Sequence, residues 1–324
     1  MTKFGIHIVP LMAADAVVEL AVAAEEIGYD YCLVADEGFH PDVYACLGAI
    51  ARETKRIWIG PATNGYTRHP AVTAAAVATI DELSKGRAFV TLLAGGSMVL
   101  GPMGIARDRP YRVVRDTMEV LEALWSGETV NWEGDQHTLR AAQLGSGRHD
   151  IPIWVTSRGP LLLGLTGRAA DGALLTVKPD LDAALAIVED AAEKAGGRTP
   201  ERIYLGRISY TPEMVDGQRS TISYVLMDSP ERVLRSLGFD AAAVELVAEA
   251  AATHEPDLLA ELITDDVLRQ YQINGTPAEC SKQVAALVSQ HRLDTLFVDV
   301  LSPDFDENLE LLHATYKILS DSRP

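Results

Sequence analysis

Two side chains of the 324-residue sequence stand where they could move protons, Asp36 and His7. Asp36 follows the apolar run of residues 31–35, and a carboxylate at the end of a buried strand suits the rim of a pocket better than a core. There it could act as a base, orient a substrate, or only cap the next turn. His7 lies between Ile6 and Ile8, so its imidazole faces the opposite side of the strand. We treat both as candidate catalytic residues, with a structural role as the alternative for each.

Two short segments are suited to hold a flat ring or an anion. Gly95 and Gly96 remove side chains at the end of an apolar run, so that a ring or a phosphate can approach the backbone, although any tight turn can also use such glycines. Ser157, Arg158 and Gly159 directly precede a helix that opens with proline. A hydroxyl, a guanidinium and the N–H groups of a helix N-terminus together predict an anion site.

The sequence contains no obvious motif for metal or nucleophilic catalysis. No His, Cys and carboxylate cluster has the spacing of metal ligands, so no metal site is predicted. There is no G-x-S-x-G motif, and no serine, histidine and acid suggest a triad. We therefore expect a bound organic cofactor to carry the chemistry.

The elements that must position these residues alternate between apolar strands and helices. Residues 56–97 show the pattern, because two apolar runs that end in small and polar residues flank a helix opening at Pro70. Its repetition predicts an α/β fold class, a (β/α)8 TIM barrel of eight strands. A doubly wound open sheet is the alternative, disfavoured because no G-x-G-x-x-G follows the first strand. In a barrel the candidate residues would meet at the carboxyl ends of the strands.

One long segment departs from this repeat. Residues 211–272 read as an alanine-rich helical stretch, which we predict to be an insertion between strands 7 and 8 of a single domain, residues 1–324. A hairpin outside the repeat is predicted over residues 129–139. Asp15 and Asp42 are predicted helix caps, and Thr276 begins a capping box.

Composition and charge narrow the functional classes. Acidic residues outnumber basic ones 46 to 28 and no lysine- or arginine-rich block occurs, which argues against nucleic acid and anionic membranes as partners. Cys32, Cys46 and Cys280 are far apart and predict buried free thiols. The sequence shows no leader at its start and no apolar run of about 18 residues, so we expect a cytoplasmic protein.

Several motifs, spread over nearly the whole chain, point to a known family. They are K-F-G-I-H-I-V-P, D-E-G-F-H-P-D-V-Y, I-G-P-A-T-N-G-Y-T-R-H-P, D-E-L-S-K-G-R with A-G-G-S, D-I-P-I-W-V-T-S-R-G-P-L-L-L, and T-D-D-V-L-R-Q-Y-Q-I-N-G-T-P-A-E. The chain thereby resembles the bacterial luciferase-like monooxygenase superfamily, and within it the methylenetetrahydromethanopterin reductases that use the deazaflavin coenzyme F420. The resemblance implies an F420-dependent oxidoreductase that moves a hydride between F420 and a small organic substrate, in a homodimer or larger homo-oligomer.

The resemblance also implies which residues hold the cofactor. Relatives end strand three in a bulge with a non-prolyl cis peptide behind the ring, which would fall within Gly60-Pro61-Ala62 here. Carried over onto this chain, the cofactor-binding residues are Pro61, Ala62, Thr63, Asn64, Gly95, Gly96, Ser157, Arg158 and Gly159. Asp36, Thr63 and Asn64 would contact the ring or its ribityl arm, and Pro61 and Ala62 would belong to the bulge behind the ring. Gly95 and Gly96 would lie near the ring, and Ser157, Arg158 and Gly159 would hold the phosphate.

This chain departs from the reductases at three positions. It has His7, Gly96 and Arg158 where they usually carry a glutamate, another acid and a glutamine. We therefore expect a substrate other than tetrahydromethanopterin, since its polar groups would meet an imidazole and a guanidinium. Two alternatives stay open: an FMN-dependent luciferase-like monooxygenase with a partner reductase, and a barrel that only binds a flavin or another ligand.

Overall fold

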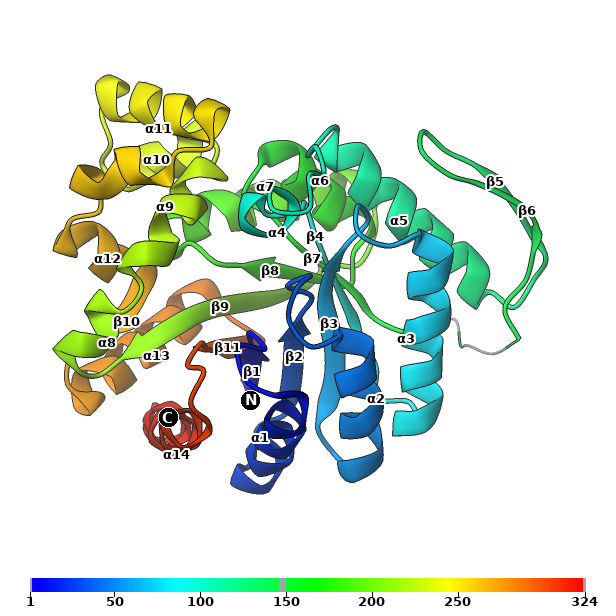
Figure 1. Cartoon of the computed structure of the whole chain (residues 1–324), viewed down its shortest axis with the longest axis horizontal. Helices are drawn as coiled ribbons and strands as arrows, with labels where there is room; N and C mark the ends of the chain where they lie inside the picture. The colour runs from blue at the N-terminus through cyan, green and yellow to red at the C-terminus, as the bar shows by residue number, and fades with distance from the viewer. Residues whose placement is uncertain (1, 146–147, 149, 323–324) are drawn as a thin grey trace.

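The computed structural model describes residues 2–145, 148 and 150–322 of the chain. Within these residues, eight parallel strands form a sheet that closes on itself, because β8 pairs with β9 (Figure 1). In order around the barrel the strands are β1 (Lys3–Ile8), β2 (Tyr31–Ala35), β3 (Trp58–Asn64), β4 (Val90–Leu93), β7 (Ile153–Thr156), β8 (Gly172–Leu175), β9 (Glu201–Ser209) and β11 (Thr295–Val300). The predicted (β/α)8 barrel is confirmed, and the open sheet is excluded since it would leave β8 and β9 unpaired.

Helices cover the outside of the barrel (Figure 1). They are α1 (Ala14–Ile27), α2 (Val43–Glu53), α3 (Pro70–Ser84), α5 (Pro110–Trp125), α6 (Pro160–Ala169), α7 (Leu181–Ala195), α13 (Pro277–His291) and α14 (Phe305–Asp321), with the short α4 (Ser97–Leu100) and η1 (Lys178–Asp180) in loops. The Asp42 carboxylate accepts bonds from two N–H groups of α2, and Thr276 forms the predicted capping box of α13. The predicted cap at Asp15 is wrong: α1 begins at Ala14, so Asp15 lies in its first turn and Ala13 is the cap.

Aromatic rings fill the amino-terminal half of the barrel interior. The ring centroids of Phe89 and Trp154 lie 4.3 Å apart, and Phe297 lies 5.9 Å from Trp154. Two strand glycines make this packing possible. A Cβ on Gly5 would lie 2.4 Å from Phe297, and one on Gly60 would lie 2.3 Å from the carbonyl oxygen of Phe89. Because side chains fill this half of the barrel, the cavity described below lies toward the carboxyl ends of the strands.

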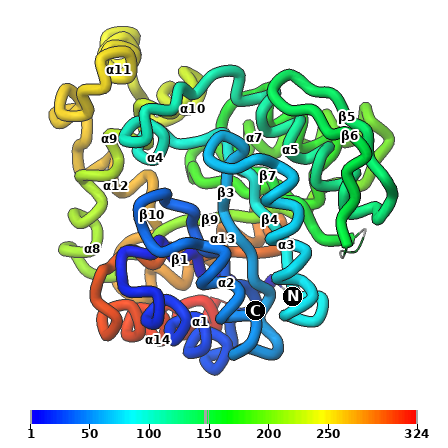
Figure 2. Tube along the Cα trace, turned by 45° about the vertical axis from the view of Figure 1, so that its right-hand side comes forward, coloured from blue at the N-terminus to red at the C-terminus, as the bar shows by residue number. Residues whose placement is uncertain are grey.

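The segment between β9 and β11 is helical, as predicted. It comprises α8 (Pro212–Asp216), α9 (Arg219–Met227), α10 (Glu231–Ser236), α11 (Ala241–Thr253), η2 (Pro256–Leu262), α12 (Asp265–Tyr271) and the short strand β10 (Gln272–Asn274), which pairs with β9. It has an apolar cluster of its own that includes Leu226, Val233 and Leu268. Figures 1 and 2 show it on the opposite side of the molecule from the predicted hairpin, β5 (Val130–Glu133) and β6 (Thr138–Ala142).

None of the helices in the described residues combines the length and the apolar character needed to cross a bilayer. Cys32, Cys46 and Cys280 are buried free thiols, as predicted.

Candidate active site

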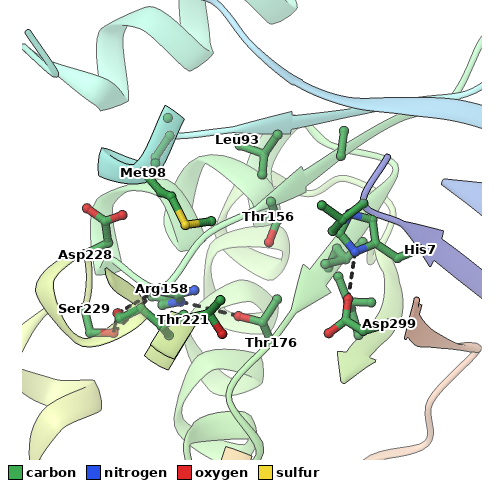
Figure 3. Close-up of a pocket in the computed structure, with 18 of the residues that line it drawn as sticks. His7, Leu93, Met98, Thr156, Arg158, Thr176, Thr221, Asp228, Ser229 and Asp299 are labelled. Carbon is green, nitrogen blue, oxygen red and sulfur yellow. Dashed lines mark hydrogen bonds and ion pairs between the residues drawn. The ribbon is translucent and has the colours of Figure 1, made fainter. Parts of the chain in front are cut away.

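A cavity of about 1320 Å³ opens at the carboxyl ends of the barrel strands. The ends of the strands form one wall, and the region around α9 of the insertion, including Ile222 and Ser229, forms another (Figure 3). Pockets for small ligands usually occupy roughly 300–1,000 Å³. This cavity therefore has room for a cofactor and a substrate side by side.

His7 lines this cavity and is joined to a carboxylate of the neighbouring strand. Its Nδ1 lies 2.7 Å from Oδ1 of Asp299, and both side chains are largely but not fully buried (Figure 3). The two residues stand opposite each other in the register of β1 and β11. A carboxylate on Nδ1 favours the tautomer that carries a proton there, which leaves the Nε2 lone pair free to take a proton.

The two acids after β2 face different sides of the barrel wall. The carboxylate of Asp36 points away from the cavity, accepts a 2.8 Å hydrogen bond from Thr63 and lies 3.4 Å from Nε of Arg68. Glu37 lines the cavity instead, and its burial raises the pKa of its carboxyl group, while His7 and His40 act in the lowering direction. Glu37 therefore has the position that the sequence analysis gave to Asp36.

The end of β3 differs from the bulge that the resemblance implied. The prediction of a cis peptide within Gly60-Pro61-Ala62 is wrong, because the peptide bonds of the described residues are trans. The strand keeps one register with β2 from Trp58 to Ala62, which leaves no extra residue to form a bulge. Ala62 is thereby directed into the cavity.

The neighbours of Ala62 lie outside the cavity lining. The peptide at Pro61 is part of the regular strand, and Thr63 is fully buried against Asp36. The side-chain oxygen of Asn64 accepts bonds from the N–H groups of Tyr66 and Thr67, so it shapes the turn before α3. Pro61, Thr63 and Asn64, which were predicted to bind the cofactor, therefore support the wall of the cavity from outside its lining.

Gly95 and Gly96 line the cavity where β4 gives way to α4. The left-handed φ of +79° at Gly95 requires glycine there, and a Cβ would also lie 2.7 Å from Leu100. Ser97, the residue after Gly96, contacts the insertion, because its N–H and its hydroxyl both donate hydrogen bonds to the carboxylate of Asp228. The glycine pair therefore lies where the barrel and the insertion meet.

Ser157, Arg158 and Gly159 also line the cavity, at the end of β7 and the start of α6. Arg158 donates to the carbonyl of Val225 at 3.0 Å and lies near the hydroxyls of Thr176 and Ser229 (Figure 3). Its burial lowers the pKa of the guanidinium. Figure 3 shows this group and the His7–Asp299 pair at opposite sides of the cavity.

The cavity is also lined by charged residues that are not among those predicted from the sequence, including Glu37, Arg207, Asp228 and Asp299. The sequence held a signal for Asp299, the charged residue of the largely apolar strand β11. Arg207 lies in β9, which also contains Glu201 and Arg202, so its charge is less distinctive. Glu37 and Asp228 lie in loops, where a charge carries no such information. Among the described residues, no group of three or more His, Cys, Asp or Glu side chains is arranged to hold a metal ion.

Comparison with known proteins agrees with this architecture. The profile of the luciferase-like monooxygenase family matches residues 2–292. The chain belongs to the luciferase-like monooxygenase family. It is 29% identical to the 5,10-methylenetetrahydromethanopterin reductase of Archaeoglobus fulgidus, covering 96% of this chain and 97% of that protein.

Two further known proteins are similar to this chain. The F420-dependent glucose-6-phosphate dehydrogenase of Nakamurella multipartita is 32% identical over 56% of this chain and 59% of its own. The solved structure of the coenzyme F420-dependent tetrahydromethanopterin reductase of Methanopyrus kandleri superposes with a TM-score of 0.82 at 24% identity, over 96% of this chain and 97% of that one. At 24% identity, the similarity to the Methanopyrus kandleri structure shows the fold alone.

Proposed function

We propose that this chain is an F420-dependent oxidoreductase that transfers a hydride between coenzyme F420 and a small organic substrate. The observation that carries the proposal is the similarity to a methylenetetrahydromethanopterin reductase over 96% of the chain. The cavity is also large enough to hold a cofactor and a substrate together. The glucose-6-phosphate dehydrogenase of Nakamurella multipartita, which is similar over 56% of this chain, is F420-dependent by name.

The residues of the cavity fit a deazaflavin with a phosphorylated tail. The hydroxyl oxygen of Ser157 is buried and has no hydrogen-bond partner among the described residues, which is costly unless a ligand supplies one. It lies beside Arg158 and the N-terminus of α6, a favourable place for a phosphate. Gly95, Gly96 and Ala62 leave space along the strand ends for a ring.

The bound deazaflavin would supply the hydride acceptor or donor, and the protein's own residues would handle the proton. Asp299 would hold the imidazole of His7 with its Nε2 lone pair toward the cavity, so that His7 accepts a proton from a substrate hydroxyl or returns it to a carbonyl. Asp36, through Thr63, would position the strand end rather than contact the substrate. The half-buried Glu37 is a second candidate for the proton.

Titration of the apo-protein with F420 and with FMN tests this proposal. Quenching of the fluorescence of each cofactor should show F420 binding at micromolar concentration and FMN at least tenfold weaker. Tight FMN binding without F420 binding would contradict the proposal and would support the alternative, an FMN-dependent monooxygenase. Binding of F420 without any hydride transfer to a broad set of carbonyl compounds or from a broad set of alcohols would favour the non-catalytic alternative.

We also propose one domain and a homo-oligomer. Both the barrel and the insertion line the cavity, which supports treating residues 1–324 as a single domain. Exposed Val72 and Leu83 on α3 are apolar side chains that a second copy could cover. Light scattering after size exclusion would measure the mass against 35.0 kDa for one chain.

A further inference from the structure

Arg207 stands beside the His7–Asp299 pair on the next strand of the barrel. Ile203 and Leu205 point into the barrel interior, so Arg207, two residues further along β9, faces the same side. Val298 pairs with Gly206, which brings Arg207 level with Asp299. Since Asp299 is in register with His7, the three side chains lie at one height on the consecutive strands β9, β11 and β1.

The guanidinium of Arg207 lacks the partners that such a group needs. No hydrogen bond or ion pair joins it to any residue in the described part of the chain, and its burial lowers its pKa although the charge of Asp299 acts in the raising direction. Its Nη2 lies 3.6 Å from where a Cβ of Gly217 would stand, on the wall of the cavity. A guanidinium has five donors, and burying them without hydrogen-bond partners is costly unless a ligand supplies acceptors.

The other arginines of the cavity differ in this respect. Arg107 pairs with Asp228 at 3.1 Å, and Arg158 bonds to a carbonyl and approaches two hydroxyls. Their partners include residues of the insertion, so both help to hold it against the barrel. Arg207, by contrast, forms no hydrogen bond or ion pair that holds the insertion against the barrel in the part of the chain that the structure describes.

We propose that Arg207 binds the carboxylate of the substrate, and that the substrate class is a hydroxy acid or the corresponding oxo acid. The planar fork of a guanidinium matches the two oxygens of a carboxylate. Neighbouring strands lie about 4.8 Å apart, and β11 lies between β9 and β1. The long side chain of Arg207 can reach across β11 toward His7, so that a carboxylate at Arg207 and a hydroxyl at His7 can belong to one short acid. This inference rests on the proposed function and adds the chemical class of its substrate.

The step balances with the groups named. In the oxidative direction the C–H bond of the hydroxyl-bearing carbon would break, and its hydrogen would leave with both electrons as a hydride, for which the bound deazaflavin would be the acceptor. The O–H bond breaks, its proton goes to Nε2 of His7, and a C=O bond forms. The carboxylate on Arg207 takes no part in the bond changes, and it fixes the carbon that reacts.

Calorimetric titration with paired ligands tests the inference without turnover. The probes are 2- and 3-hydroxy acids of four to eight carbons, each paired with its primary amide, which keeps the size and removes the charge. At least one acid should bind wild-type protein 30-fold or more tightly than its amide. Arg207→Gln should reduce that preference to threefold or less, and Arg207→Lys should give an intermediate value. Arg140→Gln, which removes the same charge from an exposed position, should leave it unchanged.

Three results would overturn the inference: no acid binds better than its amide, the preference survives in Arg207→Gln, or that variant weakens F420 binding tenfold, which would assign the arginine to the cofactor. Circular dichroism and melting temperature check that the variants are folded. Fluorescence titration with F420 is carried out on the same samples. Wild-type protein that binds F420 but no acid contradicts only the substrate class, whereas protein that binds an acid through Arg207 but no F420 contradicts only the proposed function.

Discussion

Nδ1 of His7 lies 2.7 Å from Oδ1 of Asp299, although the two residues are 292 positions apart in the chain. The contact crosses β1 and β11, the first and last strands of the barrel in sequence. It orients the imidazole of His7 at the cavity, and so determines which of its nitrogens can exchange a proton with a ligand.

Replacement of Asp299 by asparagine should change the tautomer of His7. In wild-type protein we expect the proton on Nδ1, whereas the asparagine amide can also donate, so that Nε2 becomes protonated. The ¹⁵N shifts of the imidazole report this directly, and hydride transfer should fall about 100-fold, the scale of general acid–base catalysis. Asp306→Asn, at an exposed position of α14, is the matched control. Unchanged ¹⁵N shifts in Asp299→Asn would contradict the assignment.

Glu37 should make stability depend on pH. Burial raises its pKa in the folded state, so the unfolded chain ionises first as the pH rises. The stability that wild-type protein has below the unfolded pKa, about 4.3, is therefore lost as the pH rises through the folded pKa. Glu37→Gln should match wild type near pH 4 and be more stable at pH 7 in urea unfolding. Exposed Glu53→Gln should show no such pH dependence, and an equal effect in both variants would argue against burial as the cause.

A methyl group at Gly60 should disturb the barrel interior. The Cβ of Gly60→Ala would lie 2.3 Å from the carbonyl oxygen of Phe89, so the backbone must shift, at a cost of about 1–3 kcal/mol of unfolding free energy. Gly48→Ala in α2 meets nothing within 4 Å and should stabilise the protein by about 0.5–1 kcal/mol. Urea unfolding measures both. A neutral Gly60→Ala would mean that β3 does not pack against Phe89 as described.

Asp228 should hold the insertion against the barrel. Its carboxylate accepts bonds from Ser97 and pairs with Arg107, so Asp228→Ala leaves those donors unpaired and should cost about 1–3 kcal/mol. Hydrogen exchange should accelerate in residues 97–107 and around α9. Asp216→Ala, which removes an exposed carboxylate of α8, should leave this protection unchanged. Equal exchange in both variants would show that other contacts hold the insertion.

The cysteines should be unreactive in the folded protein. Burial raises the pKa of Cys32 to about 12 and that of Cys280 to about 11, and Cys46 shifts in the same direction. A chromogenic aryl disulfide at about pH 8 should label none of the three thiols in native protein within an hour and all three in denaturant. An added Ala183→Cys on the exposed face of α7 should react at once. Rapid labelling of native wild type would contradict the burial of these side chains.

The sequence by itself determined the elements and their order. Asp42, Thr276 and the proline at position 70 act on backbone groups only a few residues away, so their effects can be read locally. The alternation around His7 likewise predicted its face of the strand, because the period of a strand is two residues. The repeated alternation of apolar runs and helical segments predicted the barrel, and the change of pattern over residues 211–272 predicted its helical insertion.

Only the tertiary structure decided which charged groups share the cavity. Asp36 and Glu37 are adjacent and chemically alike. The path of the chain after β2 places the carboxylate of Asp36 against Thr63 and the side chain of Glu37 at the cavity. Closure of the barrel brings Asp299 to His7, and the insertion supplies the partners of Arg158, which leaves Arg207 without one in the described residues. These contacts join distant parts of the chain, so no local pattern encodes them.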